Sequence, residues 1–310
     1  MRKLLVTVFI VLLSVVGFLL FPFLSKDRSG RLSNFQGPKL RELTFRETFF
    51  ENKTDNIKLA GLLFVPKGEG PFPVAVMIHG SGSSTRENPW YLAIVKTLQD
   101  SGIAVLLPDK RGCEKSEGDW VGKGVEELAT DTEAAISFIK TQKIFGYSSV
   151  GVVGLSQGGW IAPVVASGSN ELAFVVNVSG SATTGYEQLL FEERNNIALF
   201  TYDFIAGLIA PITTEKLVKM KSVAPFVEFD PLPYWKKVSI PVFIGYGEND
   251  TNCPVNLSLE RLRQTELKNL KLKIYPDGGH AVLNKSKTGL NEAFMKDLAT
   301  FVLRPEANAR

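Results

Sequence analysis

Ser149 to Gly159 reads S-V-G-V-V-G-L-S-Q-G-G, and this stretch decides the fold. Its valines form a short apolar run of the kind that suits a buried parallel strand. The next five residues, 154–158, fit the pattern G-x-S-x-G, and the apolar residues that follow predict a helix. Ser156 is therefore expected at a sharp turn from a strand into a helix.

A serine in this place is a candidate nucleophile. A free hydroxyl is a poor nucleophile and must be held, exposed, beside a base. The flanking glycines let the backbone and the helix approach closely, and the helix N-terminus favours the negative charge that develops during acyl transfer. The alternative interpretation, a glycine-rich turn without chemistry, would need neither the strand before it nor the helix after it.

Length and composition narrow the class of protein. The 310 residues suffice for one large α/β domain or two small ones. Apolar residues make up 45% and charged residues 22%, which is ordinary for a globular protein. The net charge of +3 is small and spread along the chain, so we expect no nucleic-acid partner. We expect neither a cofactor nor a metal ion.

Residues 1–25 depart from this average. Leu4 to Leu24 is almost wholly apolar and follows two basic residues. About 20 apolar residues can cross a bilayer, whereas a cleaved signal peptide has a shorter apolar core and a small-residue cleavage site, which we do not find. We therefore expect an anchor, with a signal peptide as the alternative, and a membrane-anchored or exported, extracytoplasmic protein. Residues 26–43 are polar and punctuated by Gly and Pro, which predicts a linker.

Residues 44–304 alternate between strand and helix patterns. Two antiparallel strands are predicted first, followed by strands that alternate with helices, which is typical of a parallel α/β sheet. The predicted strands are Leu43–Glu51, Ile57–Val65, Val74–Ile78, Ile103–Leu107, the run at Val150, Leu172–Val178, Ile240–Tyr246 and Leu270–Tyr275. The predicted helices are Pro89–Gln99, Val125–Lys140 and Leu290–Leu303.

An insertion at 183–237 is too long for a single crossover and predicts a helical cap. It carries apolar residues at helical spacing: Leu189, Leu190, Ile197, Phe200, Phe204, Ile205, Leu208 and Ile209. Either these side chains pack on the mouth of a pocket, or they leave an exposed patch that would touch a nearby membrane.

Serine chemistry needs a base, and the chain has only two histidines. His280 stands in a flexible loop after the last strand, where an imidazole can reach over the serine, so we predict it as the base. The alternative is a histidine on a surface loop. His79 precedes a glycine-rich loop and is better placed to shape that loop.

The base needs a carboxylate to orient it. Asp250 lies at the apex of the turn after Ile240–Tyr246, and we predict it as the acid of the triad. Glu248 is the nearest rival and Asp277 a more distant one. Each of these residues could instead be a turn former whose carboxylate accepts a hydrogen bond from its own backbone.

The chain order Ser156, Asp250, His280 matches the order of α/β-hydrolases and not that of chymotrypsin or subtilisin. Five short motifs fall in the order of that superfamily: H-G-S-G at 79–82, D-K-R-G at 109–112, G-L-S-Q-G-G at 154–159, G-E-N-D at 247–250 and G-G-H at 278–280. From about Thr44 to Leu303 the sequence resembles the α/β-hydrolase superfamily. The resemblance is closest to bacterial esterases grouped with the serine aminopeptidase-like and dienelactone hydrolase-like branches.

The resemblance implies an α/β-hydrolase fold. It implies a mostly parallel eight-stranded sheet flanked by helices, with a helical cap inserted after the sixth strand and the triad at the C-terminal edge of the sheet. It also implies an oxyanion hole built from the backbone N–H of Gln157 and of Ser81, with Gly82 as a rival to Ser81.

Two further expectations concern the loop after Ile103–Leu107. Many relatives read D-x-R-G-x-G-x-S there, and Glu114 stands in place of the second glycine. We expect Asp109 and Arg111 to hold this loop in place and not to contact substrate. In the superfamily's strand order, the strands before Cys113 and Cys253 lie four spacings apart, about 19 Å, whereas a disulfide needs Cα atoms within about 7 Å. Two free thiols are therefore predicted.

These observations lead to three functional hypotheses. The main one is a serine hydrolase that cleaves small carboxylic esters through an acyl-enzyme, because an apolar cap favours short to medium acyl groups over charged peptides. The second is a serine peptidase, in which Glu187, Glu192 or Glu193 would bind a substrate amine. These glutamates could equally form a solvated helix face. The third is a membrane-tethered binding module without chemistry, for which a complete triad would be unnecessary.

Overall fold

An eight-stranded sheet forms the centre of the computed structural model, which describes residues 2–25, 35–141, 146–169 and 171–305. The strands lie in the order β1-β2-β4-β3-β5-β6-β7-β8. β2 runs antiparallel to both neighbours, and all other pairings from β4 to β8 are parallel. The strands are β1 (Arg46–Asn52), β2 (Ile57–Phe64), β3 (Phe72–Ile78), β4 (Ala104–Pro108), β5 (Tyr147–Leu155), β6 (Val175–Val178), β7 (Val242–Gly247) and β8 (Leu270–Tyr275).

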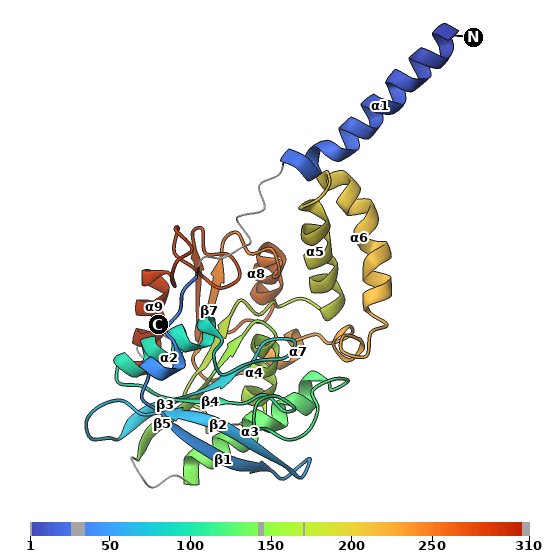
Figure 1. Cartoon of the computed structure of the whole chain (residues 1–310). Coiled ribbons are helices and arrows are strands. Elements are labelled where there is room, and N and C mark those ends of the chain that lie inside the picture. The colour runs from blue at the N-terminus through green and yellow to red at the C-terminus, as the bar shows by residue number, and fades with distance from the viewer. Residues whose placement is uncertain (1, 26–34, 142–145, 170, 306–310) are drawn as a thin grey trace.

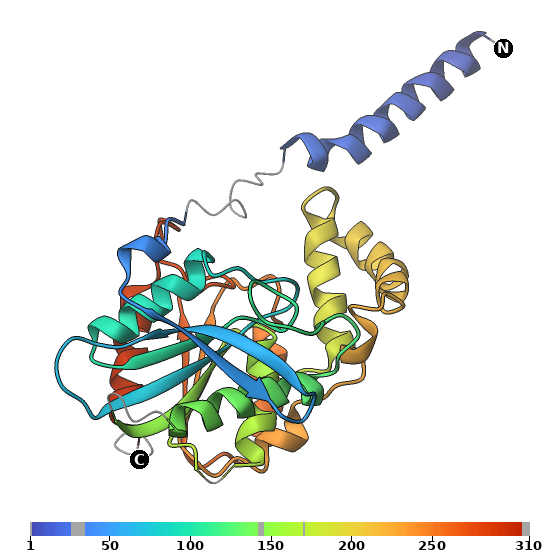
Figure 2. The ribbon, with the colours of Figure 1, turned by 60° about the horizontal axis from the view of Figure 1, so that its bottom comes forward.

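Helices cover both faces of this sheet, as Figures 1 and 2 show from two directions. One face packs against α2 (Pro89–Asp100) and α9 (Glu292–Leu303), the other against α3 (Val125–Thr141), α4 (Gly158–Ser167) and α8 (Val255–Arg263). Side chains of β5 alternate between these two layers. Val150 and Val152 join one layer, whereas Val153 and Leu155 join the other. A strand buried on both faces is apolar at nearly every position, which explains the valine run of β5.

The predicted fold class is confirmed. All eight predicted strands are present, with ends shifted by a few residues, and β6 is shorter than the predicted Leu172–Val178. Cys113 follows β4 and Cys253 follows β7, four positions apart in the strand order, and both are free thiols.

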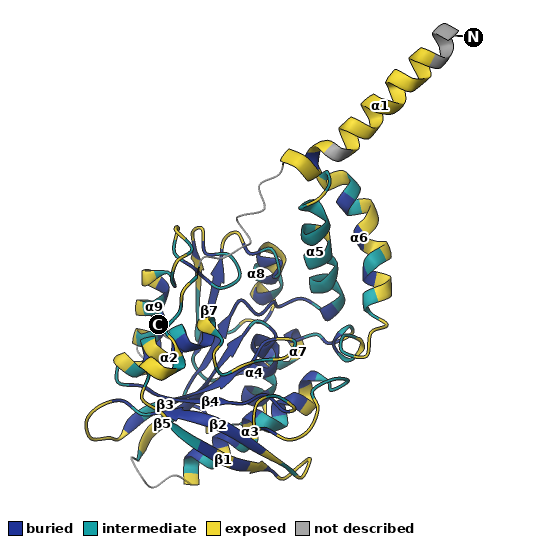
Figure 3. Ribbon diagram, viewed as in Figure 1, coloured by how far each residue is buried: buried dark blue, intermediate teal, exposed yellow. Residues whose placement is uncertain are grey.

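The helical insertion between β6 and β7 contains α5 (Gly185–Ala198), α6 (Asp203–Leu217), the short 3-10 helix η3 (Ala224–Phe226) and α7 (Leu232–Trp235). α5 and α6 form an antiparallel hairpin that stands out from the body of the protein (Figure 1). We call α5 and α6 the cap hairpin. Phe204, Leu208 and Ile212 of α6 are exposed by 62%, 70% and 62%. The apolar side chains of the cap could either pack on a pocket or form an exposed patch, and this face of α6 forms an exposed patch (Figure 3).

α1 (Arg2–Ser25) is an apolar helix that lies beside the tip of the cap hairpin (Figure 1). The rings of Phe18 and Tyr202 stack there with centroids 4.5 Å apart, and Phe23 lies near Phe200. Among the described residues, no helix is both long enough and apolar enough to cross a membrane. Of the predicted linker, residues 26–34 lie outside the described residues, and the remainder contains the 3-10 helix η2 (Leu40–Glu42).

Candidate active site

Ser156 stands at the junction of β5 and α4. Its φ of 54° places it in the left-handed region, which a residue other than glycine adopts only when the surroundings hold it there. The Ser156 N–H donates to the Val178 carbonyl (2.9 Å), and the Ser156 carbonyl accepts from Gly159 (2.8 Å). A Cβ at Gly158 would collide with the backbone of Ile78, so α4 can approach β3 this closely only with glycine at that position. The turn thus presents the Ser156 side chain at the carboxyl edge of the sheet.

The structure brings the three predicted triad residues into one line of hydrogen bonds. His280 Nε2 lies 3.0 Å from Ser156 Oγ, and His280 Nδ1 lies 2.9 Å from Asp250 Oδ2. Because the carboxylate can only accept, Nδ1 carries the proton and Nε2 is free to accept from the serine. The contacting atoms thus have the donor and acceptor roles that a base between a hydroxyl and a carboxylate requires.

Asp250 is oriented by its own turn. Its side chain is fully buried, and Oδ1 accepts from the backbone N–H of Asn252 (2.8 Å) and of Cys253 (2.9 Å). The rivals Glu248 and Asp277 are both exposed, and neither contacts His280 among the described residues. The turn-forming role and the contact with the histidine therefore belong to the same carboxylate.

His79 is occupied elsewhere. It is buried, its Nε2 donates to the Pro108 carbonyl (2.6 Å), and Ser84 Oγ donates to its Nδ1 (2.8 Å). Burial lowers the pKa of His79 to about 4, so the ring is neutral at physiological pH. His79 thus connects the loop after β3 to the end of β4, as predicted for a residue that shapes the loop.

A cavity of about 170 Å³ opens beside Ser156 between the sheet edge and the cap. Its apolar wall comes from Trp120, Trp160, Leu189, Val223, Phe226 and Val227. Ser81 and Gln157 line the same cavity. Their backbone N–H groups have no acceptor among the described residues, and neither does that of Gly82. The predicted oxyanion donors therefore lie beside the serine with their N–H groups unused, and this geometry leaves the choice between Ser81 and Gly82 open.

Glu192 also lines this cavity, which the interpretation of the cap glutamates as a solvated helix face did not anticipate. Its Oε1 accepts from Asn252 Nδ2 at 2.7 Å. Burial raises the pKa of Glu192. Glu187 differs, because it caps α5 and pairs with Arg261 at 2.7 Å.

Two carboxylates act on His280. Burial on its own would lower the pKa of His280, but the charge and hydrogen bond of Asp250 and the charge of Glu192 outweigh it, so the pKa is raised. The imidazolium that forms when a serine gives up its proton would be stabilised by the same charges.

The D-K-R-G loop after β4 is held by ion pairs, as expected. Arg86 makes two hydrogen bonds to the Asp109 carboxylate (2.8 and 2.6 Å), and the buried Arg111 guanidinium pairs with Asp131 and Asp55. Glu114 has a φ of 50°, in the left-handed region that favours the glycine of the superfamily motif.

Sequence reasoning missed three residues around the site. Lys110 contacts the backbone of the loop that carries Ser81, Tyr91 accepts a hydrogen bond from the Gly80 N–H (2.8 Å), and Asn252 holds Glu192. A lysine two residues after a buried strand was the one available signal. Within the described ranges, no group of three or more His, Cys, Asp or Glu residues is placed to hold a metal ion.

Comparisons with known proteins agree with this geometry. Esterase EstD of Thermotoga maritima is 25% identical over 270 residues, and YuxL of Bacillus subtilis, an uncharacterised peptidase, is 25% identical over 252 residues. These matches cover 80% and 76% of this chain but only 64% and 35% of the two relatives. The chain thus spans less than two thirds of the length of either.

Solved structures and sequence families extend the comparison. The esterase Pf2001 of Pyrococcus furiosus superposes with a TM-score of 0.63 and 21% identity, covering 87% of this chain and 97% of that one, which supports the fold. The prolyl oligopeptidase family matches residues 88–304, a range that contains Ser156, Asp250 and His280. The match covers well over half of the chain, so this α/β-hydrolase belongs to the prolyl oligopeptidase family.

Proposed function

We propose that the protein is a serine hydrolase that cleaves small carboxylic esters through an acyl-enzyme. The observation that carries the proposal is the continuous line of hydrogen bonds from Ser156 through His280 to Asp250 at the wall of a cavity. The esterase relative EstD supports the same chemistry.

In the proposed reaction, Ser156 Oγ attacks the ester carbonyl while His280 Nε2 takes the serine proton. The carbonyl becomes an oxyanion that accepts hydrogen bonds from the backbone N–H of Gln157 and of Ser81 or Gly82. His280 then gives its proton to the departing alcohol as the C–O bond breaks, which leaves an acyl-serine. A water molecule then attacks the acyl carbonyl while His280 takes one of its protons, which forms a second tetrahedral intermediate. When this intermediate collapses, His280 returns the proton to Ser156 Oγ, and the acid is released.

The size and lining of the cavity support short to medium acyl groups. About 170 Å³ of mostly apolar space lies beside the nucleophile. Burying apolar surface drives binding there, whereas an unpaired charge would lose its hydration.

The test combines labelling and turnover. A fluorophosphonate probe should label the wild type and not Ser156→Ala, and p-nitrophenyl acetate and butyrate should be hydrolysed at a rate that the variant lowers by about 10³-fold or more. Circular dichroism of the variant checks that it folds. A folded variant that retains turnover, or a wild type that neither labels nor hydrolyses any ester, would contradict the proposal. The latter result would favour a binding module.

Glu192 favours a second candidate, a peptidase that recognises a substrate amine. A half-buried carboxylate that lines the cavity offers the pairing that an ammonium group needs there, and YuxL is described as a peptidase. Aminoacyl p-nitroanilides should then be cleaved in preference to esters, with a preference lost in Glu192→Gln and kept in Glu193→Gln. Ester turnover that both variants retain would instead support the esterase.

We also propose that α1 attaches the protein to a membrane. Most of the described side chains of α1 are apolar and exposed, and the exposed face of α6 lies at the same end of the molecule. Full-length protein should float with phospholipid vesicles in a density gradient, whereas a chain that begins at residue 35 should remain below them. Equal flotation of the two proteins would contradict this role of α1.

A further inference from the structure

Lys110 is a buried lysine whose ammonium group binds backbone oxygens next to the active site. It follows β4 by two residues and is 8% exposed. Its Nζ donates to the Gly80 carbonyl (2.8 Å) and to the Gly82 carbonyl (2.9 Å). These two carbonyls flank Ser81, which is one of the predicted oxyanion donors.

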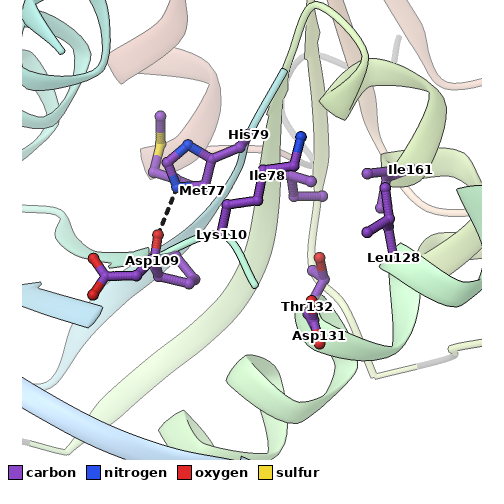
Figure 4. A pocket seen from close by; sticks show the side chains of 10 residues that line it. Met77, Ile78, His79, Asp109, Lys110, Leu128, Asp131, Thr132 and Ile161 are labelled. Atoms are coloured by element: carbon purple, nitrogen blue, oxygen red, sulfur yellow. Dashed lines mark hydrogen bonds between the residues drawn. The ribbon is translucent and has the colours of Figure 1, made fainter. Parts of the chain in front are cut away.

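No carboxylate forms an ion pair with Lys110 among the described residues. The two carboxylates that line the same small cavity as Lys110 are engaged with other residues, because Asp109 pairs with Arg86 and Asp131 pairs with Arg111. The ammonium instead lies 4.8 Å from the centroid of the Trp120 ring, and Trp120 also lines the active-site cavity. Figure 4 shows Lys110 and His79 beside the same small cavity of about 40 Å³. Burying an ammonium group without a carboxylate partner costs free energy, because the group loses its hydration. Since its partners here are two backbone carbonyls, we look for its role at those carbonyls.

Peptide geometry links the lysine to the oxyanion donor. The Gly80 carbonyl and the Ser81 N–H belong to one planar trans peptide, so they point in opposite directions. A carbonyl held on Nζ therefore directs the Ser81 N–H away from Lys110. Gly80, on the N-terminal side of this peptide, has no Cβ and would otherwise let the peptide rotate at low cost. A cation on the carbonyl also polarises the peptide, which strengthens its N–H as a donor.

We propose that Lys110 is a positioning residue that fixes the peptide between Gly80 and Ser81 and thereby sets the oxyanion donor of the Ser81 backbone. The inference rests on the proposed hydrolase function and goes beyond it by assigning the residue that holds the hole in place. It also favours Ser81 over Gly82 as the donor, because the Gly80 carbonyl shares its peptide with the Ser81 N–H.

The protonation of the Lys110 ammonium offers a second test, through the effect of pH. Burial lowers the pKa of Lys110 to about 8, although Cys113 and Asp131 oppose this shift. Around the ammonium, His79 is neutral, Asp109 is paired with Arg86 and Asp131 is paired with Arg111. The ammonium loses its charge as pH rises through about 8, so the polarising effect on the Gly80 carbonyl should weaken above that pH.

The decisive experiment compares Lys110→Met with Lys115→Met. Lys115 lies in the same loop but pairs with Glu47 at 2.8 Å on the surface. We expect Lys110→Met to lower kcat on p-nitrophenyl acetate by about 10²-fold with little change in KM, the size of effect that follows loss of one oxyanion donor. Affinity for a trifluoromethyl ketone, whose adduct with serine places an oxyanion in the hole, should fall by a similar factor. Lys115→Met should change neither.

Three outcomes would overturn the inference: a folded Lys110→Met variant with wild-type kcat, a lowered kcat with unchanged affinity for the ketone, or an equal loss in the Lys115 variant. If Lys110→Met does not fold, the dependence of wild-type kcat on pH serves as the test. We expect kcat to fall several-fold as pH rises, with an apparent pKa near 8. A profile that is flat from pH 7 to 10 would contradict the role of Lys110. A wild type without esterase activity or fluorophosphonate labelling would defeat the proposed function itself, which is a different result.

Discussion

The loops at the carboxyl edge of the sheet and the cap hairpin are built in different ways. The loop after β3 is held from three sides, by Lys110 on its carbonyls, Tyr91 on the Gly80 N–H and the two ring nitrogens of His79. The hydrogen bonds from the body to the cap hairpin are only partly buried, and they include Arg261 with Glu187 and Asn252 with Glu192. α5 has one buried residue, Gly185.

The difference separates two tasks. Groups that must stay within a few tenths of an ångström of a reacting atom belong on elements fixed by buried contacts, whereas a surface that selects substrates tolerates adjustment. Substitutions at the sheet edge should therefore act on kcat, and substitutions in the cap hairpin on substrate choice, pH range or surface binding. The predictions below test this division, from the largest effect to the smallest.

The two histidines give the largest contrast. His280→Ala removes the base and should lower kcat/KM by about 10³-fold or more. His79→Ala leaves the Pro108 carbonyl and the Ser84 hydroxyl without a buried partner, which should cost about 1 to 3 kcal/mol of stability. Its kcat/KM should fall by far less, because His79 touches the loop and not Ser156. Steady-state kinetics with thermal unfolding of both variants would measure this, and the opposite ranking would exchange the roles of the two rings.

Glu192 should affect the pH range over which the enzyme is active. Catalysis needs neutral His280, so kcat/KM should rise with pH through the pKa of His280, which lies above the ordinary value of about 6.5. Glu192 contributes to this raised pKa through its negative charge. Glu192→Gln removes that charge, so the rise should move to lower pH and activity at pH 6 should form a larger fraction of the plateau.

Glu193→Gln is the matched control, because its carboxylate does not line the cavity and is not among the groups that shift His280. Its profile of kcat/KM against pH should overlay that of the wild type. Equal shifts in the two variants would mean a general effect of net charge, and a Glu192→Gln profile identical to the wild type would remove the coupling with His280.

Much of the fold and the candidate triad could be predicted from the sequence, for a physical reason. Strands buried on both faces must be apolar throughout, and a nucleophile turn needs glycine where backbones nearly touch, so both leave local signatures. Ser156, Asp250 and His280 each follow a predicted strand of the same parallel sheet, and parallel strands end at one edge. Their meeting could therefore be expected.

The features that could not be predicted depend on which way a side chain points and on its contacts with backbone atoms. The spacing of residues along the sequence encodes neither. Glu192 and Glu193 are neighbours in one helix, and a rotation of about 100° per residue decides which of them faces the cavity. Lys110 has backbone carbonyls as partners, so no second side chain marks its role. An apolar stripe on a helix has the same spacing whether it faces a core or the solvent, and this left the outward face of α6 undecided.

Two leucines of the cap hairpin provide the last and smallest test. Leu189 lines the cavity from α5, whereas Leu208 lies on the outward face of α6. Leu189→Ser should raise KM for p-nitrophenyl butyrate more than for the acetate, because the apolar wall beside the longer chain is lost. Leu208→Ser should leave both substrates unaffected and change stability by no more than about 0.5 kcal/mol, as expected for an exposed site. If the outward face contacts lipid, this variant should also bind phospholipid vesicles more weakly than Leu189→Ser does. Loss of ester turnover in Leu208→Ser would show that the two faces of the cap hairpin are coupled, and the separation of selectivity from surface binding would then be wrong.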